Sequence, residues 1–284
     1  AVAAPDFDRD GDKDLAIAQT YINRVVFYRN TGTGFMSRVG EIKVGRRPTS
    51  LVAADFNGDG YIDVATTNKA DDNVSVLLHN KHISPPLHEQ FQFKKNYPVG
   101  DAPVHMAVAR INGDTRPDLV VANDAGGMLT VLLATTPGVF NIRKDVPTDP
   151  KPACVALGDF NSDGITDVAY ICRGVNQAQV RTGNNDGTFD PVQRFAVGGS
   201  PRAIVAIDME YDGSLDLATC NFADHTVTVL LNDIAGTFPN AMTYLAGPDP
   251  IWLCGADVDD DNDDDLVTVA KSSPSASILL NLWF

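Results

Sequence analysis

Six short segments of the chain place oxygen-bearing side chains at alternate positions. In the segment that begins at Asp55, these side chains stand at positions 1, 3, 5 and 9, as Asp55, Asn57, Asp59 and Asp63. Alternate residues of a tight loop point to the same side, so these oxygens can wrap one hard cation together with the backbone carbonyl of Tyr61 at position 7. Gly60 at position 6 can take the positive φ that the reversal of the chain needs.

Calcium is the cation that this pattern favours. Carboxylates packed this closely repel one another strongly unless a cation lies among them. Magnesium demands a small octahedron and keeps its waters, whereas calcium accepts a flexible set of six to eight oxygens. The spacing resembles the first half of an EF-hand loop, but no bidentate Glu stands at position 12 and the flanking residues predict strands. The alternative is a solvated acidic turn, because Asp, Asn and Gly also favour turns.

Five of the six segments carry a full ligand set. The predicted ligands are Asp6, Asp8, Asp10, Asp12 and Asp14 in the first loop; Asp55, Asn57, Asp59, Tyr61 and Asp63 in the second; Asp159, Asn161, Asp163, Ile165 and Asp167 in the fourth; Asp208, Glu210, Asp212, Ser214 and Asp216 in the fifth; and Asp257, Asp259, Asp261, Asp263 and Asp265 in the sixth. The fifth loop has Glu210 at position 3, and the sixth has Asn262 where the others have Gly.

The third loop departs from the pattern. Arg110 stands at position 1 and Thr115 at position 6. We expect this loop to bind no metal and the Arg110 guanidinium to replace the cation in part, by pairing with Asp114 or Asp118.

The acidic segments mark an internal repeat. They begin at residues 6, 55, 110, 159, 208 and 257, at intervals of 49, 55, 49, 49 and 49 residues. Within the second repeat, β-branched and apolar runs predict four strands at 50–55, 63–67, 74–79 and 91–99. Four-stranded repeats of this length are typical of propeller blades. We therefore predict an all-β, six-bladed β-propeller over residues 1–284, a single domain; the alternative is a β-solenoid, whose repeats are shorter.

The acidic segments also resemble a known family. The runs Leu157–Ala169 (LGDFNSDGITDVA) and Ala53–Ala65 (AADFNGDGYIDVA) are similar to the FG-GAP/VCBS repeats of integrin α-subunit propellers and of many bacterial surface proteins. This resemblance implies a propeller whose calcium-binding turn joins the first and second strands of each blade. Such repeats serve adhesion, sugar binding, scaffolding and domains attached to enzymes, so the family does not fix the function.

Composition excludes several classes of partner. The chain carries 22 Lys and Arg against 37 Asp and Glu, a formal net charge of −15, which argues against nucleic acid and anionic membranes as partners. No run of about 18 apolar residues predicts a membrane span. The chain begins at Ala1 without an initiator Met, which we read as a processed mature chain or a fragment.

The last repeat is shorter than the others. The chain ends in what aligns as a third strand, so the final blade is expected to lack its outer strand. The apolar segment 277–284 then forms an uncovered sheet edge, which is a template for pairing with another chain. The alternatives are a three-stranded final blade that stays unpaired, and a neighbouring subunit or partner protein that supplies the strand.

The remaining reactive residues carry weaker signals. Cys154 and Cys172 fall on opposite arms of one predicted hairpin, so they form either a cross-strand disulfide or two buried thiols; a Cys220–Cys254 pair is less favoured. The five histidines show no metal spacing. Two of them, His82 and His88, lie in an insertion between Lys81 and Asn96, which is either a contact surface or a long loop.

These patterns predict a calcium-stabilised, non-catalytic module. No nucleophile elbow, phosphate loop or zinc motif is present, and the conspicuous carboxylates already belong to the loops. We expect an extracellular protein, secreted or on a cell surface, because millimolar calcium there fills even weak sites. The expected role is protein binding, adhesion or self-assembly. A lectin-like propeller that binds glycans, or an accessory domain of a polysaccharide-processing enzyme, is the alternative.

Overall fold

A computed structural model describes residues 1–81, 91–261 and 263–281 of the chain. These residues form strands and turns throughout, and within them no helix is long and apolar enough to cross a bilayer. The chain divides into two compact units, residues 1–110 with 114–146 and residues 111–113 with 147–284. The expectation of a single domain stays a prediction.

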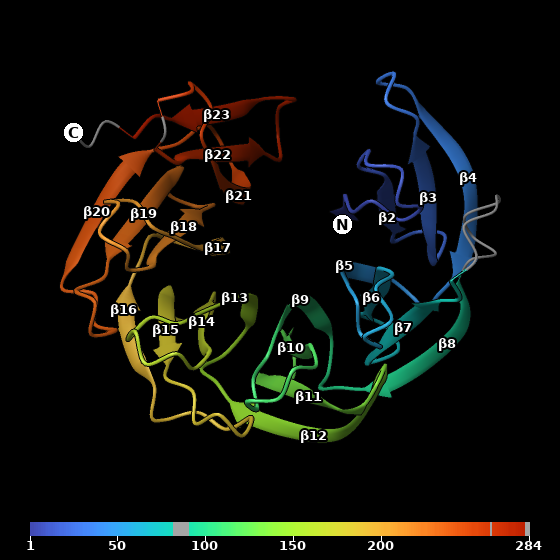
Figure 1. Cartoon of the computed structure of the whole chain (residues 1–284). Helices are drawn as coiled ribbons and strands as arrows, with labels where there is room; N and C mark the ends of the chain where they lie inside the picture. Colours follow the sequence, from blue (N-terminus) through green and yellow to red (C-terminus); the bar gives the residue numbers. More distant parts are fainter. Residues whose placement is uncertain (82–90, 262, 282–284) are drawn as a thin grey trace. The chain divides into compact units, whose positions relative to one another are not determined.

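The first unit contains three four-stranded antiparallel sheets, each a meander in which consecutive strands pair (Figure 1). Their strands are β1 (Val2–Ala3), β2 (Leu15–Gln19), β3 (Arg24–Asn30) and β4 (Met36–Lys43); β5 (Pro48–Ala54), β6 (Asp63–Asn68), β7 (Asn73–His79) and β8 (Phe91–Pro98); and β9 (Pro103–Ala109), β10 (Asp118–Asn123), β11 (Met128–Thr136) and β12 (Val139–Pro147).

The second unit repeats this topology, and its last sheet is one strand shorter. Its strands are β13 (Pro152–Gly158), β14 (Asp167–Cys172), β15 (Gln177–Arg181) and β16 (Gln193–Ala196); β17 (Pro201–Ile207), β18 (Asp216–Asn221), β19 (Thr226–Leu231) and β20 (Asn240–Leu245); and β21 (Pro250–Ala256), β22 (Asp265–Ala270) and β23 (Ala276–Leu279). One sheet per repeat confirms the predicted fold class, an all-β propeller of six blades whose last blade has three strands in the described residues.

The repeated sequence explains the strand boundaries. A proline opens the first strand of each blade from the second onward, and the residue before it has positive φ, as at Arg47 (55°) before Pro48. The second strand is buried along its whole length in four blades, as in β6. A strand covered on both faces needs apolar or hydrogen-bonded side chains at consecutive positions. For this reason these segments do not alternate between buried apolar and exposed polar residues.

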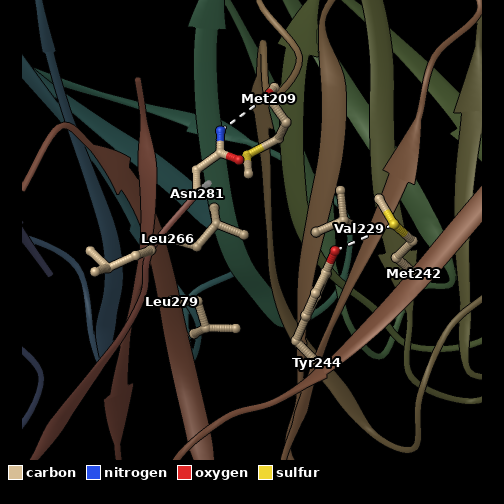
Figure 2. A pocket seen from close by; sticks show the side chains of 8 residues that line it. Met209, Val229, Met242, Tyr244, Leu266, Leu279 and Asn281 are labelled. Carbon is tan, nitrogen blue, oxygen red and sulfur yellow. Dashed lines mark hydrogen bonds between the residues drawn. The ribbon is translucent and has the colours of Figure 1, made fainter. Parts of the chain in front are cut away.

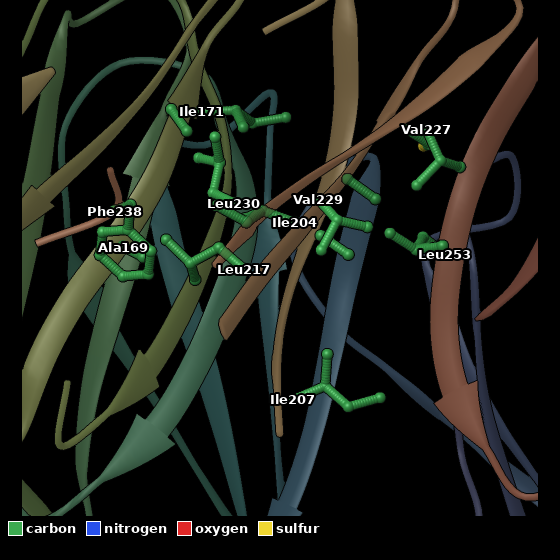
Figure 3. Packing of buried hydrophobic residues seen from close by; sticks show 14 of the residues in the cluster. Ala169, Ile171, Ile204, Ile207, Leu217, Val227, Val229, Leu230, Phe238 and Leu253 are labelled. Atoms are coloured by element: carbon green, nitrogen blue, oxygen red, sulfur yellow. The ribbon is translucent and has the colours of Figure 1, made fainter. Parts of the chain in front are cut away.

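Each unit has its own apolar core between neighbouring blades. In the second unit, the cluster around Leu217, Val229 and Phe238 joins residues from all three of its blades (Figure 3). Aromatic side chains cross from one blade to the next: Phe238, two residues before the fourth strand of blade five, packs edge-on against Phe160 of blade four. In the first unit Phe140 packs against Phe56 in the same way.

The disulfide alternative is wrong for Cys154 and Cys172. All four cysteines are free, and Cys154 pairs in register with Ile171 rather than with Cys172. The two thiols therefore point to opposite faces: Cys154 Sγ faces the Ile204 carbonyl at 3.8 Å, and Cys172 Sγ faces that of Asp149 at 3.3 Å. Burial raises the pKa of both thiols to about 12. Cys220 is a third buried thiol, and Cys254 is exposed.

Most of the insertion lies outside the described residues. This part of the chain includes His82 and His88, so its role as a contact surface stays a prediction. The end of the predicted edge strand, residues 282–284, and Asn262 of the sixth loop also fall outside the described residues.

Candidate metal centres

Each acidic loop joins the first and second strands of a blade, as the resemblance implied. In the second blade the loop runs from Asp55, just after β5, to Asp63, the first residue of β6. The Asp55 carboxylate accepts hydrogen bonds from the backbone N–H groups of Gly58 and Gly60, both at 2.7 Å. Equivalent bonds to the first carboxylate form in the first, fourth, fifth and sixth loops. The loop is therefore wound around its first Asp.

Two positions of the loop have a left-handed backbone. The φ of Gly60 at position 6 is 84°, as the sequence predicted. Position 4 also has positive φ, and there the residue is often not glycine: φ is 63° at Arg9, 59° at Ser162 and 55° at Tyr211. This second reversal was not foreseen, because these residue types give no signal for it.

The fifth position holds the loop with one oxygen of its carboxylate. Asp59 Oδ1 accepts the backbone N–H of Tyr61 at 2.9 Å, and the same turn recurs at Asp10, Asp163, Asp212 and Asp261. The other oxygen, Asp59 Oδ2, lies 3.8 Å from Lys81 Nζ. One oxygen of each carboxylate thus shapes the backbone, and the second is the one that a cation would take.

Two loops bring three carboxylates close together. One oxygen each from Asp6, Asp8 and Asp10 lies within 4.8 Å of the other two, and Asp257, Asp259 and Asp265 form an equal group. Oxygens that share one calcium ion at about 2.4 Å must lie no more than about 4.8 Å apart. In addition, the buried Asp8 Oδ1 and Asp263 Oδ1 have no hydrogen-bond partner among the described residues. These oxygens fit a hard cation.

The other loops are built differently at position 3. Within the described residues, the second, fourth and fifth loops contain no carboxylate triplet of this closeness. Asn57 and Asn161 contribute an amide oxygen in place of a carboxylate, and Asn161 Nδ2 donates to Asp163 Oδ2 at 2.9 Å. Glu210 has a longer side chain at this position of the fifth loop. The ligand sets predicted for these three loops, including the carbonyls of Tyr61, Ile165 and Ser214, stay predictions.

An arginine neighbours the first loop. Arg29 Nε lies 2.6 Å from Asp8 Oδ2, and Arg29 Nη2 lies 3.2 Å from Asp10 Oδ2. Burial raises the pKa of the Asp8 carboxyl, and the nearby Asp14 raises it further, against the opposing effect of Arg29. The guanidinium therefore already offsets part of the repulsion that a bound cation would relieve.

The ninth position is a buried structural link. Asp63 is fully buried; its Oδ2 accepts the Phe56 N–H at 2.9 Å and its Oδ1 accepts the His79 N–H at 2.7 Å. The carboxylate thus ties the loop to the end of the third strand. Burial raises the pKa of Asp63 to about 7, and burial raises that of Asp216 to about 6. Backbone N–H donors lower both values in part.

The predicted pairing in the third loop is wrong. Arg116, not Arg110, forms an ion pair with Asp114, and Arg116 Nε also donates to the Ala134 carbonyl at 2.9 Å. Within the described residues Arg110 forms no ion pair with Asp114 or Asp118; it lines, with Arg116, an open cavity of about 560 Å³ beside Asp55 and Asn57. Thr115 at position 6 lacks positive φ.

The described histidines are not part of either carboxylate group. His79 stacks on Tyr61 with ring centroids 4.9 Å apart, and His225 Nδ1 lies 3.6 Å from Asp249. Burial lowers the pKa of His105 on β9 to about 4. These contacts give His79 and His225 structural roles.

Comparisons with solved structures show the same fold in proteins of different kinds. BBS1N in complex with ARL6DN is 14% identical, with a TM-score of 0.64 over 94% of this chain and 74% of that one. A lectin from Agrocybe aegerita that recognises non-reducing terminal N-acetylglucosamine is 18% identical, with a TM-score of 0.55 over 86% of this chain and 65% of the lectin chain. A candidate 6-phosphogluconolactonase from Bacteroides fragilis is 12% identical, with a TM-score of 0.64 over 84% of this chain and 69% of that one. No curated protein has a matching sequence.

The sequence itself matches one family description. FG-GAP-like repeats are found at residues 6–66, 110–170 and 159–219, and together these segments span more than half of the chain. Each match begins at the first residue of a loop described above and continues into the following strands. The chain therefore belongs to the family of proteins built from FG-GAP-like repeats.

Proposed function

We propose that the chain is a calcium-stabilised, non-catalytic binding module that works outside the cytoplasm. The observation that carries the proposal is the pair of carboxylate triplets in the first and sixth loops, whose oxygens lie within 4.8 Å of one another. A hard cation with oxygen ligands relieves the repulsion inside each triplet. The occupied sites are the first, second, fourth, fifth and sixth loops.

Charge supports the same conclusion. Five calcium ions would add ten positive charges to the formal net charge of −15 and leave about −5. Much of the acidity would then serve the fold rather than steer a cationic ligand. Extracellular calcium, at millimolar concentration, is sufficient to fill even weak loops.

Counting calcium ions in a set of matched variants tests the proposal. Asp10→Asn, Asp59→Asn, Asp163→Asn, Asp212→Asn and Asp261→Asn each change position 5 of one proposed site, and each should lower the stoichiometry measured by calorimetry by one. Asp114→Asn is the matched control, because it changes position 5 of the third loop, which is proposed to bind no metal. A wild-type protein that binds no calcium, or an equal loss in Asp114→Asn, would contradict the proposal.

The proposed role is protein binding or self-assembly rather than catalysis. The carboxylates that could act as acid and base are assigned to the loops, and the edge of β23 is the proposed place where a partner protein or a second copy of the chain pairs. The fold alone does not decide between a binding role and catalysis, since a candidate 6-phosphogluconolactonase shares the fold. Turnover of a polysaccharide or a lactone by the isolated protein would contradict the non-catalytic role.

Glycan binding is the second candidate. The lectin from Agrocybe aegerita shares the fold over 86% of this chain. Retention of the calcium-loaded protein on a glycan array, with competition by the free sugar, would favour this role over protein binding.

A further inference from the structure

Two cavities of the molecule differ in chemical character. The second unit contains an apolar cavity of about 390 Å³ (Figure 2). The described residues that line it include no charged side chain; they are Met209, Val229, Met242, Tyr244, Leu266, Leu279, Leu280 and Asn281. Such a lining gives an ionic ligand no opposite charge. The cavity of the first unit has the opposite character.

The cavity in the first unit is formed by the second and third acidic loops. Its volume is about 560 Å³, within the range of about 300–1,000 Å³ that is usual for ligand pockets. It is lined by Asp55, Phe56, Asn57 and Gly58 of the second loop, by Arg110, Thr115, Arg116 and Pro117 of the third, and by Pro137 of the turn before β12. All of these residues belong to the first unit.

Arg110 is the residue that sets this cavity apart. In the other five repeats position 1 is an Asp that accepts N–H groups of its own loop, and a guanidinium, which has only donors, cannot take that role. Arg110 is exposed and has no ion pair or hydrogen bond of its side chain in the part of the chain that the structure describes. Elsewhere in this unit Arg24 pairs with Glu41 at 2.8 Å and Arg46 with Asp71 at 2.5 Å. The Arg110 charge is therefore available to a ligand.

Arg116, the second arginine of the lining, is held by the protein itself. Its guanidinium forms an ion pair with Asp114, and its Nε donates to the Ala134 carbonyl at 2.9 Å. The neighbouring Pro117 and Pro137 have no backbone N–H and present carbon atoms to the cavity. This side of the cavity is therefore a fixed, largely uncharged wall beside Arg110.

Asn57 supplies a second donor from the opposite loop. Its Oδ1 accepts the Asp59 N–H at 2.9 Å, which fixes the orientation of the amide, because the amide nitrogen cannot accept this bond. Within the described residues Asn57 Nδ2 has no hydrogen-bond partner. In the fourth loop the corresponding atom, Asn161 Nδ2, donates to Asp163 Oδ2 at 2.9 Å. The second loop thus keeps amide hydrogens for a ligand in the cavity.

Asp55 decides which anion fits. Its carboxylate accepts the N–H groups of Gly58, Asp59 and Gly60 at 2.7, 3.1 and 2.7 Å, so its charge is partly offset. The calcium ion proposed for this loop offsets it further. A carboxylate brings one negative charge, which Arg110 matches, whereas a dianionic phosphate would meet Asp55 with twice the repulsion. The lining therefore favours a carboxylate.

We propose that this cavity binds the carboxylate of a glutamate side chain on a partner polypeptide. The Arg110 guanidinium and Asn57 Nδ2 donate to its oxygens, and Pro117 and Pro137 contact its methylene groups. Carbon atoms beside the carboxylate suit a glutamate better than an acidic sugar, whose hydroxyls need hydrogen-bond partners there. This inference deepens the protein-binding role proposed above and rests on it. It adds the chemistry by which a partner is recognised.

A fluorine-labelled peptide tests the proposal. Trifluoroacetyl-Gly-Glu-Gly-amide is titrated with the protein in millimolar calcium, and the fluorine NMR line width is recorded. Saturable broadening is expected. Arg110→Gln in the protein, or Gln in place of Glu in the peptide, should each weaken binding at least tenfold, because each removes one charge of the pair. Asn57→Asp should also weaken binding, because a carboxylate replaces the amide donor.

Controls separate this proposal from the calcium proposal. Arg47→Gln changes an exposed arginine that does not line the cavity, and it should bind the peptide as the wild type does. Calcium uptake is measured on the same samples. Equal binding by the wild type and Arg110→Gln, equal binding of the Glu and Gln peptides, or no peptide binding by a protein that still takes up calcium would overturn the glutamate site alone.

Two further probes identify a wrong ligand class. A phosphoserine peptide that binds more tightly than the Glu peptide would overturn the proposal, because the cavity would then be a phosphate site. Galacturonate that binds more tightly than the Glu peptide would overturn it in favour of an acidic sugar. Weaker binding of both probes than of the Glu peptide is the expected result.

Discussion

Asp118 Oδ1 accepts a hydrogen bond from the Ala134 N–H at 2.8 Å, in the one repeat whose loop departs from the metal-binding pattern. The same bond, between residues 16 positions apart, recurs in the other five repeats at 2.7–2.9 Å. The third loop thus keeps a carboxylate at position 9, although Arg110 replaces the carboxylate at position 1. This position holds the blade together whether or not its loop binds an ion.

We expect Asp118→Ala to destabilise the protein without changing its calcium content. The carboxylate is fully buried, and its loss leaves the Ala134 N–H without its partner. A lost buried hydrogen bond of this kind costs about 1–3 kcal/mol of unfolding free energy. Urea unfolding measures the cost, and calorimetric titration counts the ions. Asp101→Ala, at an exposed position, is the control and should change the unfolding free energy by less than about 0.5 kcal/mol.

Removal of calcium should lower the melting temperature. Each filled site adds about 2.7 kcal/mol when free calcium is a hundredfold above its dissociation constant. Scanning calorimetry with excess EDTA, compared with 2 mM calcium, measures the difference. Magnesium at the same concentration should restore less of the stability, since it keeps its own waters. A melting curve that EDTA does not move would rule out structural calcium.

Calcium binding near pH 7 should release protons. Burial raises the pKa of Asp63 to about 7 in the metal-free protein, so this carboxyl is partly protonated there. A cation in the second loop favours the ionised form and expels the proton. Titration calorimetry in two buffers of different ionisation heat detects the release, which should shrink at pH 8.5. Buffer-independent heats at pH 7 would show that no proton leaves.

Arg29→Gln should strengthen calcium binding at the first loop. The Arg29 guanidinium pairs with Asp8 and Asp10, two of the proposed ligands. Its removal increases the repulsion inside the loop and hence the gain from a bound cation. A severalfold lower dissociation constant for one site is expected by titration, with a lower stability in EDTA. Arg38→Gln, which removes the Arg38–Glu41 ion pair, is the control. Weaker binding in Arg29→Gln would assign the arginine a supporting role instead.

His105 should make the protein less stable in mild acid. Its pKa is about 4 in the folded protein, below the ordinary value of 6.5, because burial disfavours the charged ring. Between pH 4 and pH 6.5 this side chain therefore binds more protons in the unfolded chain than in the folded protein. The contribution of His105 to the unfolding free energy is complete above pH 6.5 and is lost as the pH falls toward 4. The loss amounts to at most about 3 kcal/mol. Urea unfolding at pH 7.5 and pH 5 should show a smaller difference for His105→Gln than for the wild type.

The sequence predicted the blades well because its signals are local. Acidic loops at near-constant intervals mark the turns, and apolar runs between them mark strands, so β5 to β8 fall within two residues of their predicted bounds. The positive φ at position 6 of the acidic loops was also foreseeable, since Gly60 stands where a reversal is needed.

Other features depend on geometry that residue types do not carry. The pairing runs in one unbroken register from Gly158–Asp167 to Cys154–Ile171 and is centred between residues 162 and 163, so counting from Asp163 misplaced the thiols by one residue. Arg116 lies two residues from Asp114 in a tight turn and reaches it more readily than Arg110. The two hydrogen bonds that Asp63 accepts from backbone N–H groups could not be predicted from the sequence. An Asp at position 9 is the same residue whether it binds a metal ion or the protein backbone.

Two Gly-X-Phe turns, Gly138–Phe140 and Gly236–Phe238, place an aromatic ring of a later repeat over the repeat before it. Phe140 covers Phe56 and Phe238 covers Phe160. At these two junctions, each of which lies within one unit, the earlier blade is therefore covered by a part of the chain that leaves the ribosome later.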